Sequence, residues 1–162
     1  MSQDEKYKKL SLSAYQVSDI IYQFVSICKD SDKALNDYGT GEVYTALEVH
    51  TVSRIEDHPG VSVTEIAEQT SRTKGAVSQI ITKLEGKGLI RREKDPDNPR
   101  RVCLYVTPLG LELSKRHKQY DEENMGPVID RLISLFGYDA VEKHYQIMLD
   151  QIKQTIKYNH GE

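Results

Sequence analysis

Basic side chains are concentrated in one short segment of the chain, residues 72–101. This segment holds nine lysine and arginine residues against four acidic residues, a balance of +5, whereas the whole chain has a net charge of −3. Ammonium and guanidinium groups gathered in this way are suited to binding phosphate. A solvated charged surface without a ligand is the competing interpretation, because local charge alone does not distinguish the two.

The apolar residues of this segment predict a helix that leaves a polar face open. Val77, Ile80, Ile81 and Leu84 lie at i, i+3, i+4 and i+7, which places them on one face of a helix capped by Thr73. The residues expected on the opposite face are Thr73, Lys74, Gly75, Ser78, Gln79, Thr82 and Lys83. Such a face fits the major groove of DNA, where Lys74 and Gln79 could hydrogen-bond to base edges.

Gly75 is unusual because a glycine inside a helix costs about 1 kcal/mol relative to alanine. Close approach of the helix backbone to DNA would explain it. Tolerance of glycine near the start of a helix explains it equally well, and both interpretations stay open.

A shorter helix is predicted immediately before the helix that Thr73 caps. Residues 62–65, Ser-Val-Thr-Glu, have the spacing of a capping box, and a break is expected at 70–72. Two helices joined by a short turn form a helix-turn-helix. Ser62 and Thr64 would lie at the N-terminus of this shorter helix, where backbone N–H groups favour phosphate.

The pattern then changes to a β-hairpin. Residues 89–94 and 101–106 alternate as strands do, and the connector 95–99 contains two prolines, which suits a hairpin tip. A basic hairpin after a helix-turn-helix is a wing, and Arg100 could enter a minor groove from it. The wing residues expected to contact DNA are Arg91, Asn98, Arg100 and Arg101.

Helices are predicted on both sides of this unit. The apolar spacing predicts one helix over residues 7–36 and another over 42–57. A helix after Pro108 is expected to be interrupted at Gly126-Pro127 before a final helix. The fold class is therefore mainly α with a small β-hairpin wing (α+β).

From Glu48 through Gly110 the sequence resembles the MarR family of bacterial transcription regulators. The stretches that carry the resemblance are EVHTVSRI and VTEIAEQTSRTKGAVSQIITKLEGKGLIRREKDPDNPRRVCLYVTPLG. The arginine of the family's wing falls on Arg100. An acidic residue precedes that arginine by two positions in the family and helps to orient it, whereas Asn98 stands there in this chain, next to Asp97.

The resemblance implies a homodimer and a pseudo-palindromic operator in double-stranded DNA. The helical stripes at the two ends of the chain also exceed what a small winged domain needs for its core. We therefore expect residues 1–41 and 108–162 to form a helical dimerisation region around a DNA-binding domain at 42–107. The resemblance further implies a repressor released by a small molecule or another chemical signal, but the sequence does not identify the effector.

The sequence also leaves room for other kinds of signal and of function. A redox or zinc response through Cys28 is one alternative, with Glu42, His50 and His117 as further zinc ligands, but the spacing favours ordinary packing and no metal or cofactor is expected. A winged-helix module that binds proteins is another. No catalytic motif points to an enzyme. The lack of a signal peptide, of an apolar span and of a disulfide framework predicts a cytoplasmic protein without membrane contact.

Overall fold

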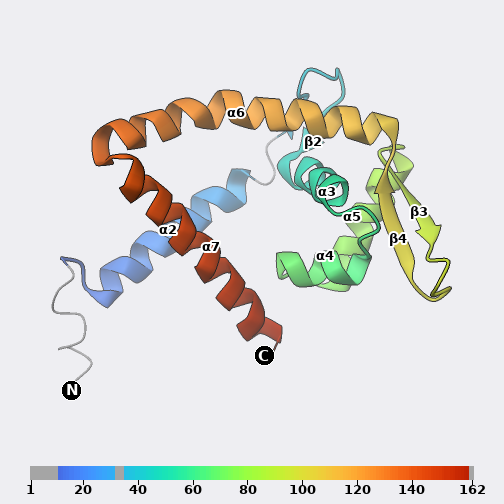
Figure 1. Ribbon diagram of the computed structural model, residues 1–162, viewed down its shortest axis with the longest axis horizontal. Coiled ribbons are helices and arrows are strands. Elements are labelled where there is room, and N and C mark those ends of the chain that lie inside the picture. The colour runs from blue at the N-terminus through green and yellow to red at the C-terminus, as the bar shows by residue number, and fades with distance from the viewer. Residues whose placement is uncertain (1–10, 32–34, 161–162) are drawn as a thin grey trace.

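The structure, a computed structural model, describes residues 11–31 and 35–160, without the side chains of 27–31 and 158–160. Its centre is a winged helix-turn-helix. Helices α3 (Ala46–Asp57), α4 (Val63–Thr70) and α5 (Lys74–Gly86) are followed by the antiparallel strands β3 (Ile90–Lys94) and β4 (Val102–Val106). The predicted mainly helical fold with a small hairpin is confirmed (Figure 1).

The three helices begin at hydroxyl caps. Thr45 and Ser62 form capping boxes with Glu48 and Glu65, and the Thr73 hydroxyl accepts a hydrogen bond from the N–H of Ala76. Each cap satisfies backbone donors that the first turn of a helix leaves without partners. The capping box at Ser62 and the cap at Thr73 are thus confirmed.

The core lies between these helices and the hairpin. It contains the apolar faces of α3, α4 and α5 together with residues from both strands and the start of α6. Its completely or almost completely buried members include Val49, Val52, Ile55, Ile66, Ala67, Val77, Ile81, Leu84, Leu89, Leu104 and Leu113. The predicted inward face of α5 is therefore confirmed, and the small residue Ala67 is buried in α4, which contacts α5.

Long helices flank this unit. Helix α2 (Ala14–Ser31) precedes it, α6 (Pro108–Phe136) leaves the hairpin along one side, and α7 (Tyr138–His160) returns towards α4 (Figure 1). Two short strands, β1 (Leu35–Asn36) and β2 (Tyr44–Thr45), pair between α2 and α3. No helix in the described part of the chain is both long and apolar enough to span a membrane.

Two predicted helix boundaries were wrong before residue 46. The helix expected over 7–36 is helical from 14 to 31, and residues 35–36 pair with 44–45; residues 1–10 lie outside the described part. The helix expected to begin at 42 begins at Ala46, because Thr45 caps it. Tyr38, Gly39 and Gly41 have positive φ, so the chain turns sharply between the two strands.

The interruption expected at Gly126-Pro127 was also wrong. Helix α6 continues through Pro127 and ends at Gly137, which has a φ of 81° and donates its N–H to the carbonyl of Ile133. A proline removes one N–H from the helix, so the carbonyl of Glu123 loses its partner. Both Glu123 and Pro127 are exposed, which allows water to hydrogen-bond that carbonyl.

Candidate nucleic-acid interface

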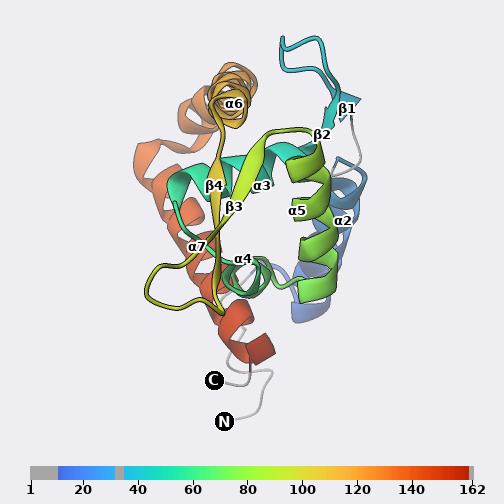
Figure 2. The same cartoon turned by 90° about the vertical axis from the view of Figure 1, so that its right-hand side faces the viewer.

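The polar face of α5 is open to solvent. All seven residues predicted for it are exposed, while Val77, Ile81 and Leu84 on the opposite face are buried. Figure 2 shows α5 beside the β3–β4 hairpin on the side turned towards the viewer, with α4 at their lower end. The helix thus presents Lys74, Gly75, Ser78 and Gln79 on its exposed surface.

The two ends of this face differ in how they are held. Among the described residues, no hydrogen bond or ion pair involves the side chain of Lys74, Ser78 or Gln79. Towards the C-terminus, the Thr82 hydroxyl accepts from Arg92 Nη2 at 3.0 Å, and Lys83 Nζ lies 3.2 Å from Glu48 Oε1. The N-terminal half of α5 is therefore free to bind, whereas its C-terminal half is tied to the body of the domain.

Glu48 is the buried anchor of that C-terminal half. Its carboxylate accepts from Lys87 Nζ at 2.7 Å and, through the other oxygen, from the N–H of Thr45 at 2.8 Å. Burial alone raises the pKa of Glu48, but the hydrogen bonds from Lys87, Thr45 and Lys83 outweigh it and lower the pKa to about 2. Glu48 was not predicted as a site residue, although the Thr45-to-Glu48 spacing is itself a capping-box signal.

The polar groups at the N-terminus of α4 hydrogen-bond to one another. Ser62 Oγ accepts from the N–H of Glu65 at 3.2 Å, and Glu65 Oε2 accepts from the N–H of Ser62 at 2.7 Å. The hydrogen bonds from Ser62, more than that from Arg101, lower the pKa of Glu65. Ser62 and Thr64 are both half-buried. The hydroxyl of Ser62 thus already has a partner, and Thr64 presents less of its surface than the residues of α5.

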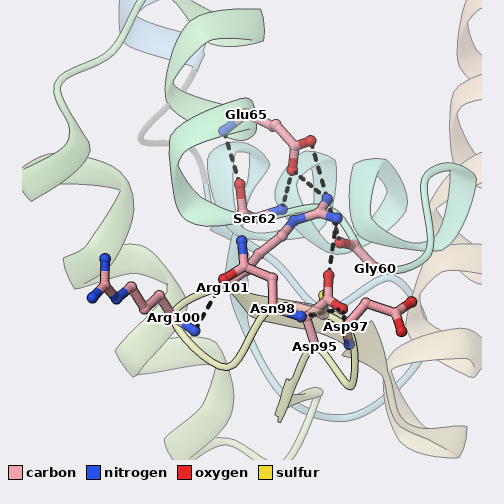
Figure 3. Close-up of polar contacts among 9 residues, drawn as sticks. Gly60, Ser62, Glu65, Asp95, Asp97, Asn98, Arg100 and Arg101 are labelled. Carbon is pink, nitrogen blue, oxygen red and sulfur yellow. Dashed lines mark hydrogen bonds and ion pairs between the residues drawn. The ribbon is translucent and has the colours of Figure 1, made fainter.

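Arg101 joins the wing to α4. Its Nη2 lies 3.1 Å from both carboxylate oxygens of Glu65 and donates to the carbonyl of Gly60 at 3.3 Å, while Nη1 lies 3.3 Å from Asp95 Oδ2 (Figure 3). The hydrogen bond that Arg101 donates to Glu65 is the main reason that the pKa of Arg101 is raised. These contacts hold the hairpin against the start of α4.

Arg100 points the other way. Its side chain is exposed and extends away from Arg101 and Glu65 (Figure 3). Its backbone N–H donates to Asn98 Oδ1 at 3.2 Å, and Asp95 Oδ1 accepts from the N–H of Asp97 at 2.9 Å. The hydrogen bond from the Asp97 N–H is the main cause of the lowered pKa of Asp95. Asn98 therefore orients the backbone of Arg100 rather than its guanidinium.

Arg91 lies at the base of the hairpin instead of its tip. Its Nε donates to Glu93 at 2.7 Å, its Nη1 donates to the carbonyl of Val106 at 2.9 Å, and its guanidinium lies 5.1 Å from the centroid of the Tyr105 ring. The structure therefore engages Arg91 within the wing and Arg101 with both the wing and the start of α4. It leaves Arg100 and the N-terminal half of α5 facing outward.

The comparisons with known proteins agree with this geometry. Residues 44–102 match the family model described as MarR family. The HTH-type transcriptional regulator YhjH of Bacillus subtilis is 37% identical over 87 residues, which cover 54% of this chain and 50% of that protein. The chain spans about half the length of the curated relatives it matches, and these are named transcriptional regulators rather than enzymes.

Two solved structures share the fold over most of the chain. FabT of Streptococcus pneumoniae, crystallised in complex with DNA, is 22% identical with a TM-score of 0.65 and covers 86% of this chain and 99% of its own. The transcriptional regulator SlyA is 16% identical with a TM-score of 0.73 and covers 88% of this chain and 97% of its own. Residues 44–102, which form the winged helix-turn-helix, therefore resemble the MarR family in sequence, and the chain shares its fold with these two solved structures.

Proposed function

We propose that the protein is a dimeric, sequence-specific DNA-binding regulator of transcription, and that it represses until a chemical signal releases it. The observation that carries the proposal is the exposed polar face of α5, with Lys74, Ser78 and Gln79 unengaged beside a basic wing. FabT, which has the same fold, was crystallised with DNA. Residues 42–107 form the DNA-binding domain in this proposal.

The residues of the interface have different tasks. Lys74 and Gln79 read base edges in the major groove, and Gly75 allows the helix backbone to come close. Arg100 enters the adjacent minor groove. The further contacts that we assign are those of Thr73, Ser78, Thr82 and Lys83 on α5, of Ser62 and Thr64 at the start of α4, and of Arg91, Asn98 and Arg101 in the wing.

The flanking helices support a dimer formed by residues 1–41 and 108–162. Helix α2 exposes Tyr15 and Tyr22, and α7 exposes Tyr138 and Ile147, each to half or more, and none of these side chains lines the cavity described next. Apolar surface of this extent gains about 25 cal/mol per Å² when it is buried. A second copy of the chain covers these faces and places two α5 helices at half-sites of a pseudo-palindromic operator.

A cavity supports a response to a small molecule. It has a volume of about 700 Å³, lies between α2, α7 and the end of α4, and is lined mainly by apolar side chains such as Ile21, Phe24 and Met148. Cavities of roughly 300–1,000 Å³ hold drug-sized ligands. The wall formed by Gln69, Thr70 and Ser71 precedes α5 directly, so a ligand here acts on the turn of the helix-turn-helix.

The decisive experiment is a DNA-binding titration of the full chain with the duplex upstream of its own gene. We expect tight binding whose log Kobs falls with log salt concentration, by about 0.9 for each phosphate neutralised. Gln79→Ala relaxes base preference at one position of each half-site at a cost of about 1–3 kcal/mol. Selection from a random DNA library measures that preference directly.

Lys143→Ala is the matched control, because Lys143 is exposed on α7 away from the interface. It leaves the selected motif and the affinity unchanged. A flat salt response, or the same selected motif for wild type and Gln79→Ala, contradicts the proposal. Binding of a protein partner by the α5 face in place of DNA would establish the competing winged-helix interaction module.

A further inference from the structure

Arg92 of β3 holds two side chains of α5. Its Nη2 donates to the Thr82 hydroxyl at 3.0 Å, and its Nε lies 3.2 Å from Glu85 Oε2. Residues three positions apart are neighbours on the surface of a helix, so Thr82 and Glu85 lie on the same side of α5. A single guanidinium therefore spans almost one turn of this helix.

The place of Arg92 in the hairpin makes this contact separate from the one made by Arg101. Arg92 pairs with Leu104 across the hairpin, and Leu104 is completely buried. Directly opposed residues lie on the same face of a sheet, so Arg92 lies on the face that packs against the domain. Arg101 instead reaches Glu65 at the start of α4. The hairpin is thus attached to both helices of the helix-turn-helix, by a different arginine in each case.

The connection between α5 and β3 attaches the wing at the C-terminal end of the helix. It consists of residues 87–89, and the N–H of Leu89 donates to the carbonyl of Leu84 at 3.0 Å. Thr82 lies four residues before the end of the helix, about 6 Å along its axis. Arg92 therefore adds a second point of attachment, which resists rotation of the wing about the first.

We propose that Arg92 is a positioning residue for DNA binding, which fixes the separation between α5 and the outward Arg100 and does not itself contact DNA. The inference rests on the proposed function, in which α5 occupies a major groove and Arg100 enters the adjacent minor groove. Both can bind one duplex together only at a suitable separation. Holding that separation before DNA arrives reduces the conformational entropy that is lost on binding.

A direct phosphate contact by Arg92 is the competing interpretation, because guanidinium groups bind phosphate well. The Nε and Nη2 donors of Arg92 are directed to α5, however, and the Glu85 carboxylate offsets its charge. Its side chain is 35% exposed, whereas Arg100 is exposed and directed outward. The Thr82 hydroxyl accepts from Arg92 and keeps its own proton, which it can still donate to a phosphate oxygen.

The test is a double-mutant cycle on the full chain, with affinity for the duplex upstream of its own gene measured over a range of salt concentrations. We expect Arg92→Ala to weaken binding by about five- to tenfold, with the wild-type slope of log Kobs against log salt concentration. In the Arg100→Ala background the same substitution has no further effect, because the wing contact that Arg92 positions is already gone. A merely structural role of Arg92 would not produce this coupling.

Two further variants separate positioning from charge. Arg92→Lys keeps the positive charge but has a single nitrogen in place of the planar guanidinium, so we expect it to bind DNA as weakly as Arg92→Ala. Glu85→Ala removes a negative charge from α5, which by charge alone would strengthen DNA binding. We expect it to weaken binding, because Arg92 loses a partner. Lys143→Ala, exposed on α7, is the control and changes neither affinity nor slope.

Circular dichroism of each variant verifies that it is folded. A slope that is smaller by about 0.9 in Arg92→Ala overturns the proposal, because Arg92 would then neutralise a phosphate. Additive losses in the double variant, or tighter binding by Glu85→Ala, also overturn it. If the wild type binds DNA and Arg92→Ala binds equally well, this inference alone fails. If the wild type shows no salt-dependent binding, the proposed function fails and this inference fails with it.

Discussion

Arg101 and Glu65 form an ion pair that connects the wing to the helix-turn-helix. Arg101 Nη2 lies 3.1 Å from both carboxylate oxygens of Glu65, and the same carboxylate closes the capping box of α4. One acidic side chain therefore starts a helix and positions a hairpin. Because Arg101 is held on this side, the neighbouring Arg100 is directed outward (Figure 3).

Alanine substitutions of the two neighbouring arginines should have different effects, one on DNA affinity and the other on how firmly the wing is held. Arg100→Ala removes an outward guanidinium, so we expect weaker DNA binding and an unfolding free energy within about 0.5 kcal/mol of wild type. Arg101→Ala removes a partly exposed ion pair worth about 0–1 kcal/mol and loosens the hairpin. Amide hydrogen exchange across 95–101 should accelerate in Arg101→Ala alone. Equal exchange in the two variants would contradict the role given to Arg101.

Glu48 should make stability depend on acidity. Its folded pKa of about 2 lies below the usual value of 4.5, so its contribution is complete above about pH 4.5 and is lost as the pH falls towards 2. The shift corresponds to up to about 3 kcal/mol. Glu48→Gln should lower the unfolding free energy at pH 6 and flatten this acid limb in urea titrations.

Glu122→Gln is the control for that measurement, since Glu122 is exposed on α6. It should retain the wild-type dependence between pH 2 and 5. If Glu48→Gln follows the same acid limb as wild type, the pairing with Lys87 and Lys83 does not stabilise the fold.

Two glycines of α6 should respond differently to alanine. A Cβ at Gly110 would overlap the carbonyl oxygen of Leu89, which is backbone and cannot swing aside, whereas a Cβ at Gly126 meets nothing within 4 Å. We expect Gly110→Ala to destabilise by about 1–3 kcal/mol through overpacking. Gly126→Ala should change the unfolding free energy by less than about 1 kcal/mol, because the gain in helix propensity is offset by crowding of the new Cβ against the ring of Pro127. Thermal unfolding of both variants compares them, and a neutral Gly110→Ala would show that the helix can withdraw from Leu89.

Gly75→Ala decides between the two interpretations of that glycine. A Cβ at this position meets nothing within 4 Å, so the fold itself does not require glycine there. The unfolding free energy should rise by up to about 1 kcal/mol. If the backbone comes close to DNA, affinity falls at least tenfold at the same time. Unchanged affinity would leave mere tolerance near the helix start as the explanation.

The sequence predicted the winged domain well because its signals are local. The apolar spacing of Val77, Ile81 and Leu84 and the capping pair Ser62 and Glu65 each determine structure within a few residues. The exposure of Lys74 and Gln79 followed from the same spacing. These features needed no knowledge of distant contacts.

The features that were missed depend on contacts between distant segments. The approach of Lys87 to Glu48 and of Arg101 to Glu65 joins residues 39 and 36 positions apart. Periodicity carries no information on such pairs, so the partners that Glu48 and Arg101 have within the chain were not predicted. The helix break predicted at Pro127 was wrong for another reason. A proline within a helix removes one hydrogen bond, but the sequence does not show whether the carbonyl left without a partner, here that of Glu123, can reach water.

The unbroken course of α6 through Pro127 has a mechanical consequence. At 1.5 Å per residue, its 29 residues make a rod about 44 Å long. At one end of this helix Gly110 packs closely against the backbone of Leu89, the residue before β3, and at the other end α7 follows. Tilting such a lever by about 5° displaces its tip by roughly 4 Å, more than the 3.4 Å rise of one base step along a DNA strand.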